Sequence, residues 1–273
     1  MVDNINFPLV TVCFITYNRI DILRKSFYLF LNRCTYPRER LELILCDDCS
    51  PSCVQTELRK MPFDKHIISN KNTGLGNNTN NGIRAASGEY ILQLQDDWLT
   101  PIKGDFIESS IELMAKNPDV MMVRFDYAPD TIPSDIEFYE KNKYKDGEFL
   151  ILKSNKSKIL LSQRYSPYSD WPHIKNRDFH NTLGLYKENV PMTTMELDFV
   201  ERFSSQNIVK IGYISNIYYF EDIGMYNSWN PSKKRDQLKK TLLENYFTRY
   251  PLKIFLLIKH KLYRKLIKLY SRL

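Results

Sequence analysis

The first hundred residues alternate between short apolar runs and amphipathic segments. The run "LVTVCFI" at residues 9–15 is typical of a buried β-strand, and the polar stretch "TYNR" ends it. Apolar residues then recur at three- and four-residue steps, which predicts a helix with Asn18 as its N-terminal cap. The apolar face of this helix consists of Ile20, Leu23, Phe27, Phe30 and Leu31.

The same alternation continues to residue 95. Further strands are predicted at residues 41–46 ("LELILC"), 65–69 ("KHIIS") and 89–95 ("EYILQLQ"), with a short helix after the first of these. The Gly- and Asn-rich residues 70–83 are predicted to form a loop that leads into a short helix, "GIRAAS". Strands that alternate with helices predict an α/β fold with a doubly wound, mostly parallel sheet. Such sheets bind ligands at the carboxyl ends of their strands.

The pattern is less regular in the second half. Residues 126–170 are polar and are predicted to be irregular, as in a variable region that selects a partner. Strands are predicted in "HIKNRDF", "KIGYIS" and "IYYF", and a helix in "MTTMELDFVERF" with Met195, Phe199 and Phe203 on one face. The predicted organisation is a domain at residues 1–230, with halves 1–102 and 103–230, and a helical tail at residues 231–273.

Charge separates the same two parts of the chain. The sequence has 273 residues, 43% of them apolar, which suits one large domain, and a net charge of +7. Residues 233–272 hold 13 Lys and Arg against two acids, a charge of +11, which leaves −4 for the rest. A basic tail on a mildly acidic body indicates an anionic partner for the tail alone. No nucleic-acid recognition motif accompanies the tail, so we do not expect nucleic acid as a partner.

Cysteine usage and hydropathy indicate the compartment. Five cysteines, an odd number, favour a reduced cytoplasmic setting. The N-terminal residues lack the pattern of a signal peptide, and no apolar run has the length of a membrane span. The "CDDCSPSC" spacing of Cys46, Cys49 and Cys53 resembles a zinc or redox motif, but no second ligand pair follows, so we do not expect such a site.

The fourth predicted strand ends in two adjacent acids, Asp96 and Asp97, followed by Trp98. Successive side chains of a strand point to opposite faces, so one carboxylate is expected to bind a metal ion and the other a neighbouring hydroxyl group. Acids without a nearby Cys or His favour a hard cation, Mg²⁺ or Mn²⁺, which shares its ligand shell with water and phosphate. The alternative is an ordinary polar turn at a strand end.

Four motifs over residues 9–101 carry a family resemblance. "VTVCFITYNR", "LILCDDCSP", "NTGLGNNTNNGIRAASGEYI" and "LQDDW" follow one another with normal spacing, and together they resemble the nucleotide-sugar half of family-2 glycosyltransferases of the GT-A fold. Two positions depart from the family pattern. Leu94 stands where members often carry an acid, and Thr79 stands where they usually carry an Arg.

The resemblance implies a role for the polar residues that follow the strands. Tyr17 would stack on the nucleobase, and Asp48 would accept the imide N–H of uracil or thymine. Asp96 would reach the ribose or the metal shell, and Asp97 would hold the metal beneath the diphosphate. The implied donor-binding set is Tyr17, Asn18, Arg19, Asp48, Asn72, Gly74, Asn80, Asp96, Lys233 and Arg235.

The family keeps its catalytic base near the start of a later helix. Aligning "DF" of that motif makes Glu196 the candidate base and Asp198 the second candidate, although both could be solvent-facing acids. On the acceptor side, Trp98 and Trp171 are candidates to pack on a sugar ring, with His173 beside them. Burial in the core is an equal alternative for the tryptophans, and a structural role is the more common one for a histidine.

Two later segments would complete the donor site. Asp222 stands where a family His can complete the metal shell, and it joins Asp96 and Asp97 as a metal candidate. Lys233 and Arg235 lie in a basic stretch that would close over the diphosphate, or would simply be solvated.

The resemblance and the residues together predict a metal-dependent, inverting glycosyltransferase. It would move sugar from a UDP- or dTDP-sugar to a hydroxyl group of a saccharide or lipid-linked saccharide in surface polysaccharide assembly. One alternative is a catalytically silent binding subunit. Another is a sugar nucleotidyltransferase, but that class needs a Gly-rich phosphate loop after the first strand, which "TYNRI" does not provide.

The sequence of the C-terminal tail indicates where the protein is located in the cell. Its apolar positions repeat at helical spacing and its basic residues lie largely elsewhere, which favours a helix on an anionic membrane surface. We therefore expect a peripheral protein on the inner face of the cell membrane. The alternative is a helix that docks on the domain.

Overall fold

The computed structural model describes residues 7–125, 136–144, 147–154, 168–206, 210–215 and 217–224. The chain divides into two compact units, residues 1–228 and 229–273, and every described residue belongs to the first. The basic tail and the candidates Lys233 and Arg235 lie outside the described residues.

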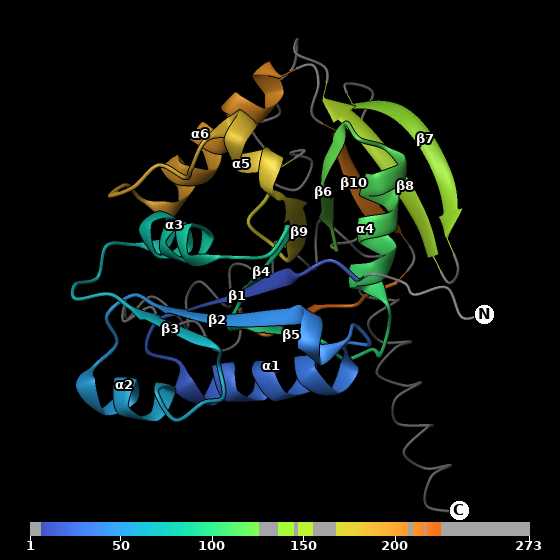
Figure 1. Cartoon of the computed structure of the whole chain (residues 1–273). Coiled ribbons are helices and arrows are strands. Elements are labelled where there is room, and N and C mark those ends of the chain that lie inside the picture. Colours follow the sequence, from blue (N-terminus) through green and yellow to red (C-terminus); the bar gives the residue numbers. More distant parts are fainter. Residues whose placement is uncertain are drawn as a thin grey trace, which may run out of the picture. The chain divides into compact units, whose positions relative to one another are not determined.

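The first unit is built on a nine-stranded sheet in the order β3-β2-β1-β4-β9-β6-β10-β8-β7 (Figure 1). The pairings run seven strands in one direction and β9 and β8 in the other, so the predicted mostly parallel α/β sheet is confirmed. The nine strands are β1 (Val10–Thr16), β2 (Leu41–Asp47), β3 (Lys65–Ile68), β4 (Tyr90–Gln95), β6 (Val120–Arg124), β7 (Ile136–Tyr144), β8 (Gly147–Ser154), β9 (His173–Asn176) and β10 (Lys210–Ser215).

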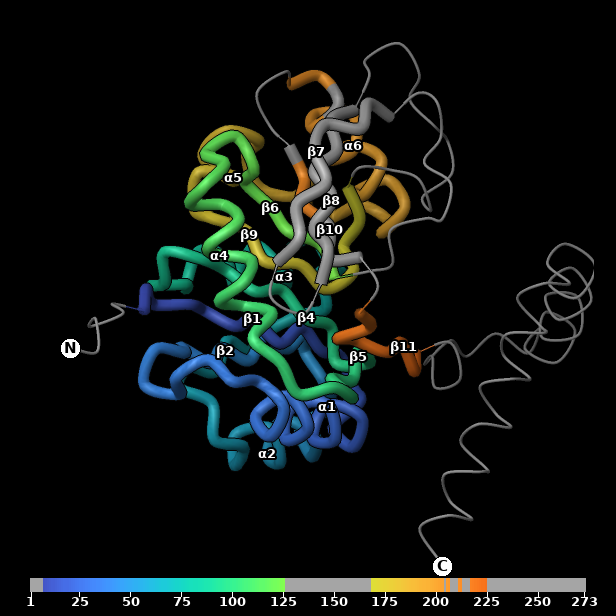
Figure 2. The backbone as a smooth tube through the Cα atoms, turned by 90° about the vertical axis from the view of Figure 1, so that its right-hand side faces the viewer, coloured from blue at the N-terminus to red at the C-terminus, as the bar shows by residue number. Residues whose placement is uncertain are grey.

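A separate two-stranded ribbon pairs β5 (Trp98–Leu99) with β11 (Glu221–Asp222), and Figure 2 shows the two strands side by side. The described helices are α1 (Ile20–Arg33), the 3₁₀ turn η1 (Arg38–Arg40), α2 (Ser52–Leu58), α3 (Leu75–Ala85), α4 (Phe106–Lys116), α5 (Arg177–Leu183) and α6 (Met192–Ser205). None of them is long and apolar enough to cross a membrane.

Alternate side chains of β1 face different helices. Val12 and Phe14 pack against α1, where Phe27 contacts Phe14 edge to face with 5.5 Å between ring centroids. Cys13 and Ile15 belong to a second cluster on the side of α3. Figure 1 shows α1 and α2 on one side of these strands and α3 on the other. The continuous apolar run of β1 is therefore explained by a strand that is buried on both faces.

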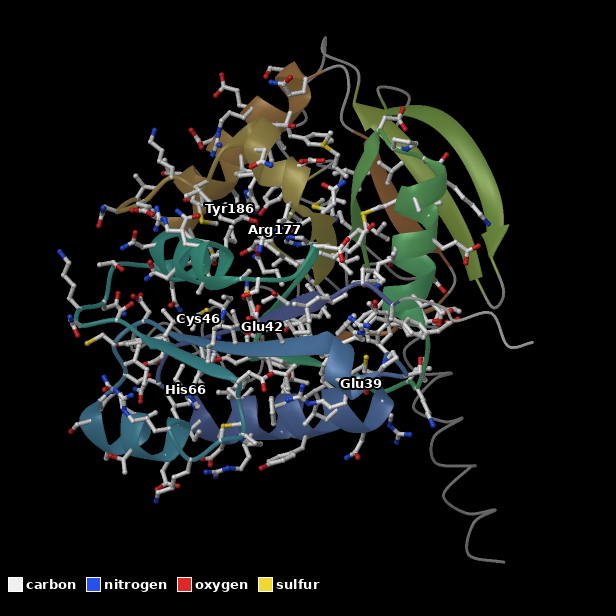
Figure 3. The ribbon with its side chains drawn as sticks, viewed as in Figure 1. Glu39, Glu42, Cys46, His66, Arg177 and Tyr186 are labelled. Atoms are coloured by element: carbon white, nitrogen blue, oxygen red, sulfur yellow. The ribbon has the colours of Figure 1, made fainter. Side chains whose placement is uncertain are left out.

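Helix α3 approaches the sheet closely because it carries a glycine where it crosses β1 and β2. A Cβ atom at Gly82 would lie 2.6 Å from Cys46 Sγ and 3.2 Å from Cys13 Sγ. Figure 3 labels Cys46 between β2 and α3. The thiols of Cys13 and Cys46 are buried packing groups between the sheet and α3.

The second half of the sheet is also covered on both faces. Met122 of β6 and Ile211 of β10 pack with Phe199 of α6, whereas Val123 faces the cluster that contains Phe106 of α4. The predicted apolar face of α6 is confirmed, because Met195, Phe199 and Phe203 are at most 1% exposed. Helix α6 is thereby fixed against the sheet on the same side as α3.

Two local predictions in the first half are wrong. Helix α1 begins after Arg19, which caps it without a side-chain hydrogen bond, whereas Asn18 adopts a left-handed backbone with φ of 53°. Helix α3 begins at Leu75, inside the predicted loop. Tertiary hydrogen bonds explain this early start, because Asn78 Nδ2 donates to Cys46 O at 3.0 Å and offsets its low helix propensity.

Three predictions in the second half are also corrected. Residues 126–170 contain the paired strands β7 and β8. The predicted strand "HIKNRDF" ends at Asn176, whose side chain accepts a hydrogen bond from Phe179 N at 3.0 Å and so starts α5. Residues 217–220 have no regular structure, and the short strand β11 follows them.

Candidate active site

The ends of β1, β2 and β4 place the predicted site residues together. Thr16 at the end of β1 is in register with Asp47 of β2, and Ile15 is in register with Gln95 at the end of β4. Because these strands are parallel, the segments after them leave the sheet at the same edge. Tyr17, which follows Thr16, is 36% exposed.

The two acids at the end of β2 shape the loops around this edge. Asp47 is fully buried and accepts hydrogen bonds from the backbone and the hydroxyl group of Ser50. Asp48 Oδ1 accepts from Thr73 N at 2.9 Å, and Asp48 Oδ2 accepts from Gly74 N at 2.8 Å. Asp48 therefore ties β2 to the start of α3. Oδ1 accepts a second hydrogen bond, from Thr73 Oγ1 at 3.2 Å, so Oδ2 is the oxygen that still has a lone pair for a ligand.

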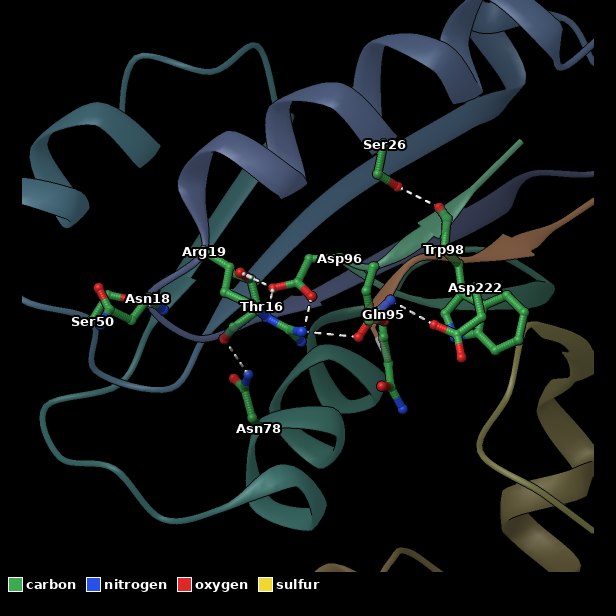
Figure 4. A network of polar contacts seen from close by, with 12 residues as sticks. Thr16, Asn18, Arg19, Ser26, Ser50, Asn78, Gln95, Asp96, Trp98 and Asp222 are labelled. Atoms are coloured by element: carbon green, nitrogen blue, oxygen red, sulfur yellow. Dashed lines mark hydrogen bonds and ion pairs between the residues drawn. The ribbon is translucent and has the colours of Figure 1, made fainter. Parts of the chain in front are cut away.

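Arg19 holds the two acids at the end of β4 (Figure 4). Its NH2 lies 2.5 Å from Asp96 Oδ1, and its NH1 lies 2.9 Å from Asp97 Oδ2. Asp96 Oδ2 also accepts a hydrogen bond from Thr16 Oγ1 at 2.6 Å. Burial raises the pKa of Asp96 to about 7 although Arg19 acts in the opposite direction. The side chain of Asp96 is 0% exposed, so it faces the protein, whereas that of Asp97 is 13% exposed.

Asp97 and Asp222 flank one small space. Trp98, next to Asp97, pairs with Asp222 in the β5–β11 ribbon, and Ile223 N donates to Asp97 O at 3.0 Å. A Cβ atom at Gly224 would collide with the Asp97 carboxylate and would lie 3.1 Å from Asp222 Oδ1. Only a glycine leaves this space open between the two carboxylates.

The residues around this space fit a divalent cation. Asp97 Oδ1 is buried and has no hydrogen-bond partner in the described part of the chain, so its lone pairs are available. The described residues contain no group of three or more His, Cys, Asp or Glu side chains arranged for a metal. Two carboxylates suffice for Mg²⁺ or Mn²⁺, which take remaining ligands from water and phosphate. Asp97 and Asp222 would hold the ion, and the buried Asp96 would orient Arg19.

Three other donor candidates take different places. Asn80 is fully buried, and its Nδ2 donates to Tyr186 O at 2.9 Å, so it joins α3 to the segment after α5. Asn18 N donates to Ser50 Oγ at 2.7 Å, which fixes the loop after β1. Asn72 is exposed in the loop before α3. The structure thus places Asn80 and the backbone of Asn18 in supporting positions.

The predicted acceptor residues separate into one exposed and two buried side chains. Trp171 is 43% exposed, and its ring lies 5.5 Å from that of Trp98, centroid to centroid. Trp98 is 8% exposed and belongs to the core cluster under α1. His173 is 0% exposed, and its Nδ1 lies 2.6 Å from Trp171 O. Trp171 alone of these residues presents a ring to a ligand.

The two candidate bases differ in their surroundings. Glu196 is 6% exposed and is hydrogen-bonded to Asp170. Asp198, one helical position further, forms an ion pair with Arg202, with 2.6 Å between Oδ2 and NH2. Arg202 thus occupies an oxygen of the Asp198 carboxylate, and Glu196 remains the first candidate base.

Comparison with known proteins agrees with this geometry. The profile of glycosyl transferase family 2 matches residues 11–186, which is more than half of the chain. The chain belongs to glycosyl transferase family 2. EpsH of Bacillus subtilis (strain 168), which carries the name of a glycosyltransferase, is 28% identical over 137 residues, covering 47% of this chain and 38% of EpsH.

Solved glycosyltransferase structures share the fold. S. aureus TarS 1-349, in complex with UDP-GlcNAc, superposes with a TM-score of 0.54 at 17% identity, covering 78% of this chain and 57% of TarS. The mannosyltransferase PcManGT from Pyrobaculum calidifontis, in complex with GDP-Man and Mn²⁺, gives 0.51 at 18% identity, covering 76% of this chain and 57% of PcManGT. The chain thus spans less than two thirds of the length of each of these three proteins.

This family-2 glycosyltransferase also has a buried polar cluster that the sequence did not reveal. Lys175 of β9 is 0% exposed, and its Nζ donates to Gln93 Oε1 at 2.9 Å and to Tyr186 OH at 3.1 Å. Tyr168 OH donates to Tyr186 OH at 2.6 Å, and Figure 3 labels Tyr186 above α3. Burial lowers the pKa of Lys175 to about 7. A single Lys in the strand "HIKN" gave no sign of this role.

Proposed function

We propose that this family-2 glycosyltransferase is a metal-dependent, inverting enzyme that transfers a sugar from a UDP- or dTDP-sugar to a hydroxyl group of a saccharide. The observation that carries the proposal is the convergence of the Asp97 and Asp222 carboxylates at Gly224, on the strand edge where Tyr17 and Asp48 also lie. A divalent cation there would neutralise the charge of the departing diphosphate.

The pyrimidine preference rests on Asp48 and Tyr17. Asp48 is fixed by two backbone N–H groups, so its orientation does not depend on a ligand. A carboxylate that accepts a further hydrogen bond suits the imide N–H of uracil or thymine. TarS was solved with UDP-GlcNAc, which is consistent with a uridine donor, whereas PcManGT was solved with GDP-Man.

The transfer step assigns a proton acceptor. In an inverting displacement the acceptor oxygen forms a bond to the anomeric carbon while the bond from that carbon to the diphosphate oxygen breaks. The acceptor hydroxyl group must lose its proton in this step, and Glu196 takes it. Trp171 would pack on the acceptor sugar, since its exposed ring lies beside the β5–β11 ribbon that carries Asp222.

A panel of nucleotide sugars tests this proposal. Purified full-length protein is heated with UDP-, dTDP- and GDP-sugars, each with and without Mn²⁺, because a bound donor stabilises the native state by mass action. We expect a rise in Tm for UDP- or dTDP-sugars that depends on Mn²⁺, followed by donor hydrolysis or transfer. Donor binding without turnover of any donor would instead identify a silent binding subunit, for which the departures at Leu94 and Thr79 give some weight.

We also propose that the tail holds the enzyme on an anionic membrane, next to a lipid-linked acceptor used in surface polysaccharide assembly. The support is the sequence of residues 233–272, with a charge of +11. Each basic residue near an anionic surface contributes about 1 kcal/mol. Full-length protein should sediment with phosphatidylserine vesicles at low salt and should remain in solution at high salt. A full-length variant with Lys261, Arg264, Lys265 and Lys268 changed to Gln should bind weakly; binding equal to wild type would exclude the tail as anchor.

A further inference from the structure

Asp170 and Glu196 form a buried carboxyl pair. Asp170 lies in the segment before β9 and is 5% exposed, and Glu196 lies on α6 and is 6% exposed. The two side chains are hydrogen-bonded to each other. Two carboxylates in contact in a buried place cannot both be ionised without a large cost. The pair must therefore hold a proton.

Gln95 connects this pair to the end of β4. Its Nε2 donates to Asp170 Oδ2 at 2.8 Å, and Gln95 directly precedes Asp96 and Asp97 in the sequence. When Asp170 is protonated, Oδ2 is the oxygen that stays an acceptor, because Gln95 donates to it. The other oxygen, Oδ1, then carries the proton and can donate it in a hydrogen bond.

We propose that Asp170 is a positioning residue for the catalytic base: it stays protonated, donates a hydrogen bond to the Glu196 carboxylate, and is itself held by Gln95. In this arrangement one side chain joins the helix that carries the base to the strand that carries the metal-binding acids. The inference rests on the proposed transferase function. It adds a residue and a protonation state that the sequence motifs do not contain.

The electrostatics of Asp170 agree with this assignment. Burial raises the pKa of Asp170 well above its ordinary value, and the contact with Glu196 raises it further, while the bond from Gln95 opposes the shift. The other titratable groups that face Asp170 are Tyr168, on its own segment, and Tyr186, after α5. Burial raises the pKa of both phenols, so both are neutral near pH 7. The direction of the Asp170 shift thus agrees with the proposal that Asp170 carries the proton.

The proton balance of the transfer step follows. The acceptor hydroxyl group gives its proton to the Glu196 carboxylate as its oxygen bonds to the anomeric carbon and the diphosphate leaves. Glu196 returns that proton to solvent after the product departs. Asp170 exchanges no proton in the step. Its hydrogen bond directs the free oxygen of Glu196, and a neutral donor in general stabilises a carboxylate over the protonated form.

Two substitutions at one position test the inference. Asp170→Asn keeps the geometry of a protonated carboxyl group, since the amide NH₂ can donate to Glu196 and the amide oxygen can accept from Gln95. Asp170→Ala removes both bonds. Steady-state kinetics with the donor identified by the panel are measured from pH 5 to 9, with UDP affinity from calorimetry. Asp178→Asn, an exposed acid on α5, serves as the matched control.

We expect the Ala variant to lose about 10²-fold in kcat with unchanged UDP affinity, and the acid limb of its pH profile to move to higher pH. The Asn variant should keep the wild-type pH profile and should exceed the Ala variant in kcat by about tenfold or more. A merely structural role would lower the Tm and change kcat without moving the pH limb.

Three results overturn the inference. If Asp170→Asn loses as much kcat as Glu196→Gln, Asp170 exchanges a proton or acts as an anion. If Asp170→Ala folds and matches wild type in both kcat and pH profile, Glu196 needs no partner. If the Ala variant does not fold, the kcat and pH profile of the Asn variant decide whether Asp170 positions Glu196. Absence of transfer by the wild-type protein from every donor would overturn the proposed function itself, and this inference with it.

Discussion

The carboxyl pair at the end of β4 and the carboxyl pair that joins α6 to the segment before β9 are stabilised by different partners. Asp96 and Asp97 share one guanidinium group, that of Arg19, with ion-pair distances of 2.5 and 2.9 Å. Asp170 is held by an amide, from Gln95, and by the carboxyl group of Glu196. One pair is neutralised by a cation and the other by a proton.

This difference assigns different chemistry to the two pairs. A pair that already accommodates a positive charge, and that leaves Asp97 Oδ1 without a partner in the described part of the chain, suits a metal ion and a diphosphate. A buried pair that shares a proton, with no cation between its carboxyl groups, suits proton transfer. The predictions below test whether the two pairs are divided in this way.

The largest effect is expected for Asp97→Ala. Among the described residues, this change leaves Asp222 as the single proposed metal ligand at Gly224, so transfer should be abolished and donor binding should no longer depend on metal. The measurement is calorimetry of UDP binding with and without Mn²⁺, together with the Tm. Asp21→Ala removes a carboxylate that is 94% exposed on α1 and is the matched control. Metal dependence equal to wild type in the Asp97 variant would contradict the assignment of a metal to this pair.

The second effect should be a loss of turnover without a loss of donor affinity. Glu196→Gln removes the proton acceptor but not the donor site, and loss of a general base typically costs about 10²–10⁴ in rate. Asp198→Asn should change kcat far less, because Asp198 is paired with Arg202. Glu201→Gln, an exposed acid of the same helix, controls for the change in helix charge. If Asp198→Asn shows the larger loss, the two candidates exchange roles.

The first pair could be predicted from the sequence, because the parallel sheet fixes its place. An apolar run that ends in "QDDW" puts its acids at the carboxyl edge wherever the strand lies in the sheet. The separate roles of Asp96 and Asp97 could not be predicted from the sequence in the same way. The distance from Arg19 to Asp96 depends on how the loop after β1 turns, and the left-handed backbone of Asn18 decides that turn.

The second pair could not be predicted in the same way. Asp170 and Gln95 are 75 residues apart, and they meet because β9 returns antiparallel to β4, which a run of four apolar and polar residues does not reveal. Glu196 was found by family resemblance and not by its spacing. Lys175 was missed because a charged residue in a short strand normally indicates an exposed edge, whereas here both neighbouring strands cover it.

A smaller loss of activity is expected for a substitution of Trp171. This substitution tests whether acceptor binding is independent of the Asp96–Asp97 pair. Trp171→Ala should raise the acceptor KM about tenfold, or ~1.4 kcal/mol of lost contact, with UDP affinity unchanged. The reason is that the exposed ring contacts the buried Trp98 rather than any donor candidate. Tyr28→Ala, at an aromatic residue of similar exposure on α1, is the control. A drop in UDP affinity would place Trp171 in the donor site instead.

The smallest effect on activity is expected for Lys175→Met. This substitution tests whether Lys175, which contacts Tyr186 near Asp170, is uncharged near pH 8. Burial lowers the pKa of Lys175 from its ordinary 10.5 to about 7. Between those values the unfolded chain binds a proton that the folded protein does not, so the free energy of unfolding should rise with pH by up to about 1.4 kcal/mol per pH unit.

The Met variant lacks this titration, so its stability should not show that rise, and its kcat should stay close to wild type. Urea unfolding at pH 7, 8 and 9 measures the difference, with Lys116→Met as a control because that ammonium group is exposed on α4. Equal pH slopes in wild type and the Lys175 variant would mean that Lys175 keeps its proton, held by Gln93 and Tyr186. A buried cation would then lie beside Tyr186, which faces Asp170, and the proton of the second pair would no longer be its only neutralising charge.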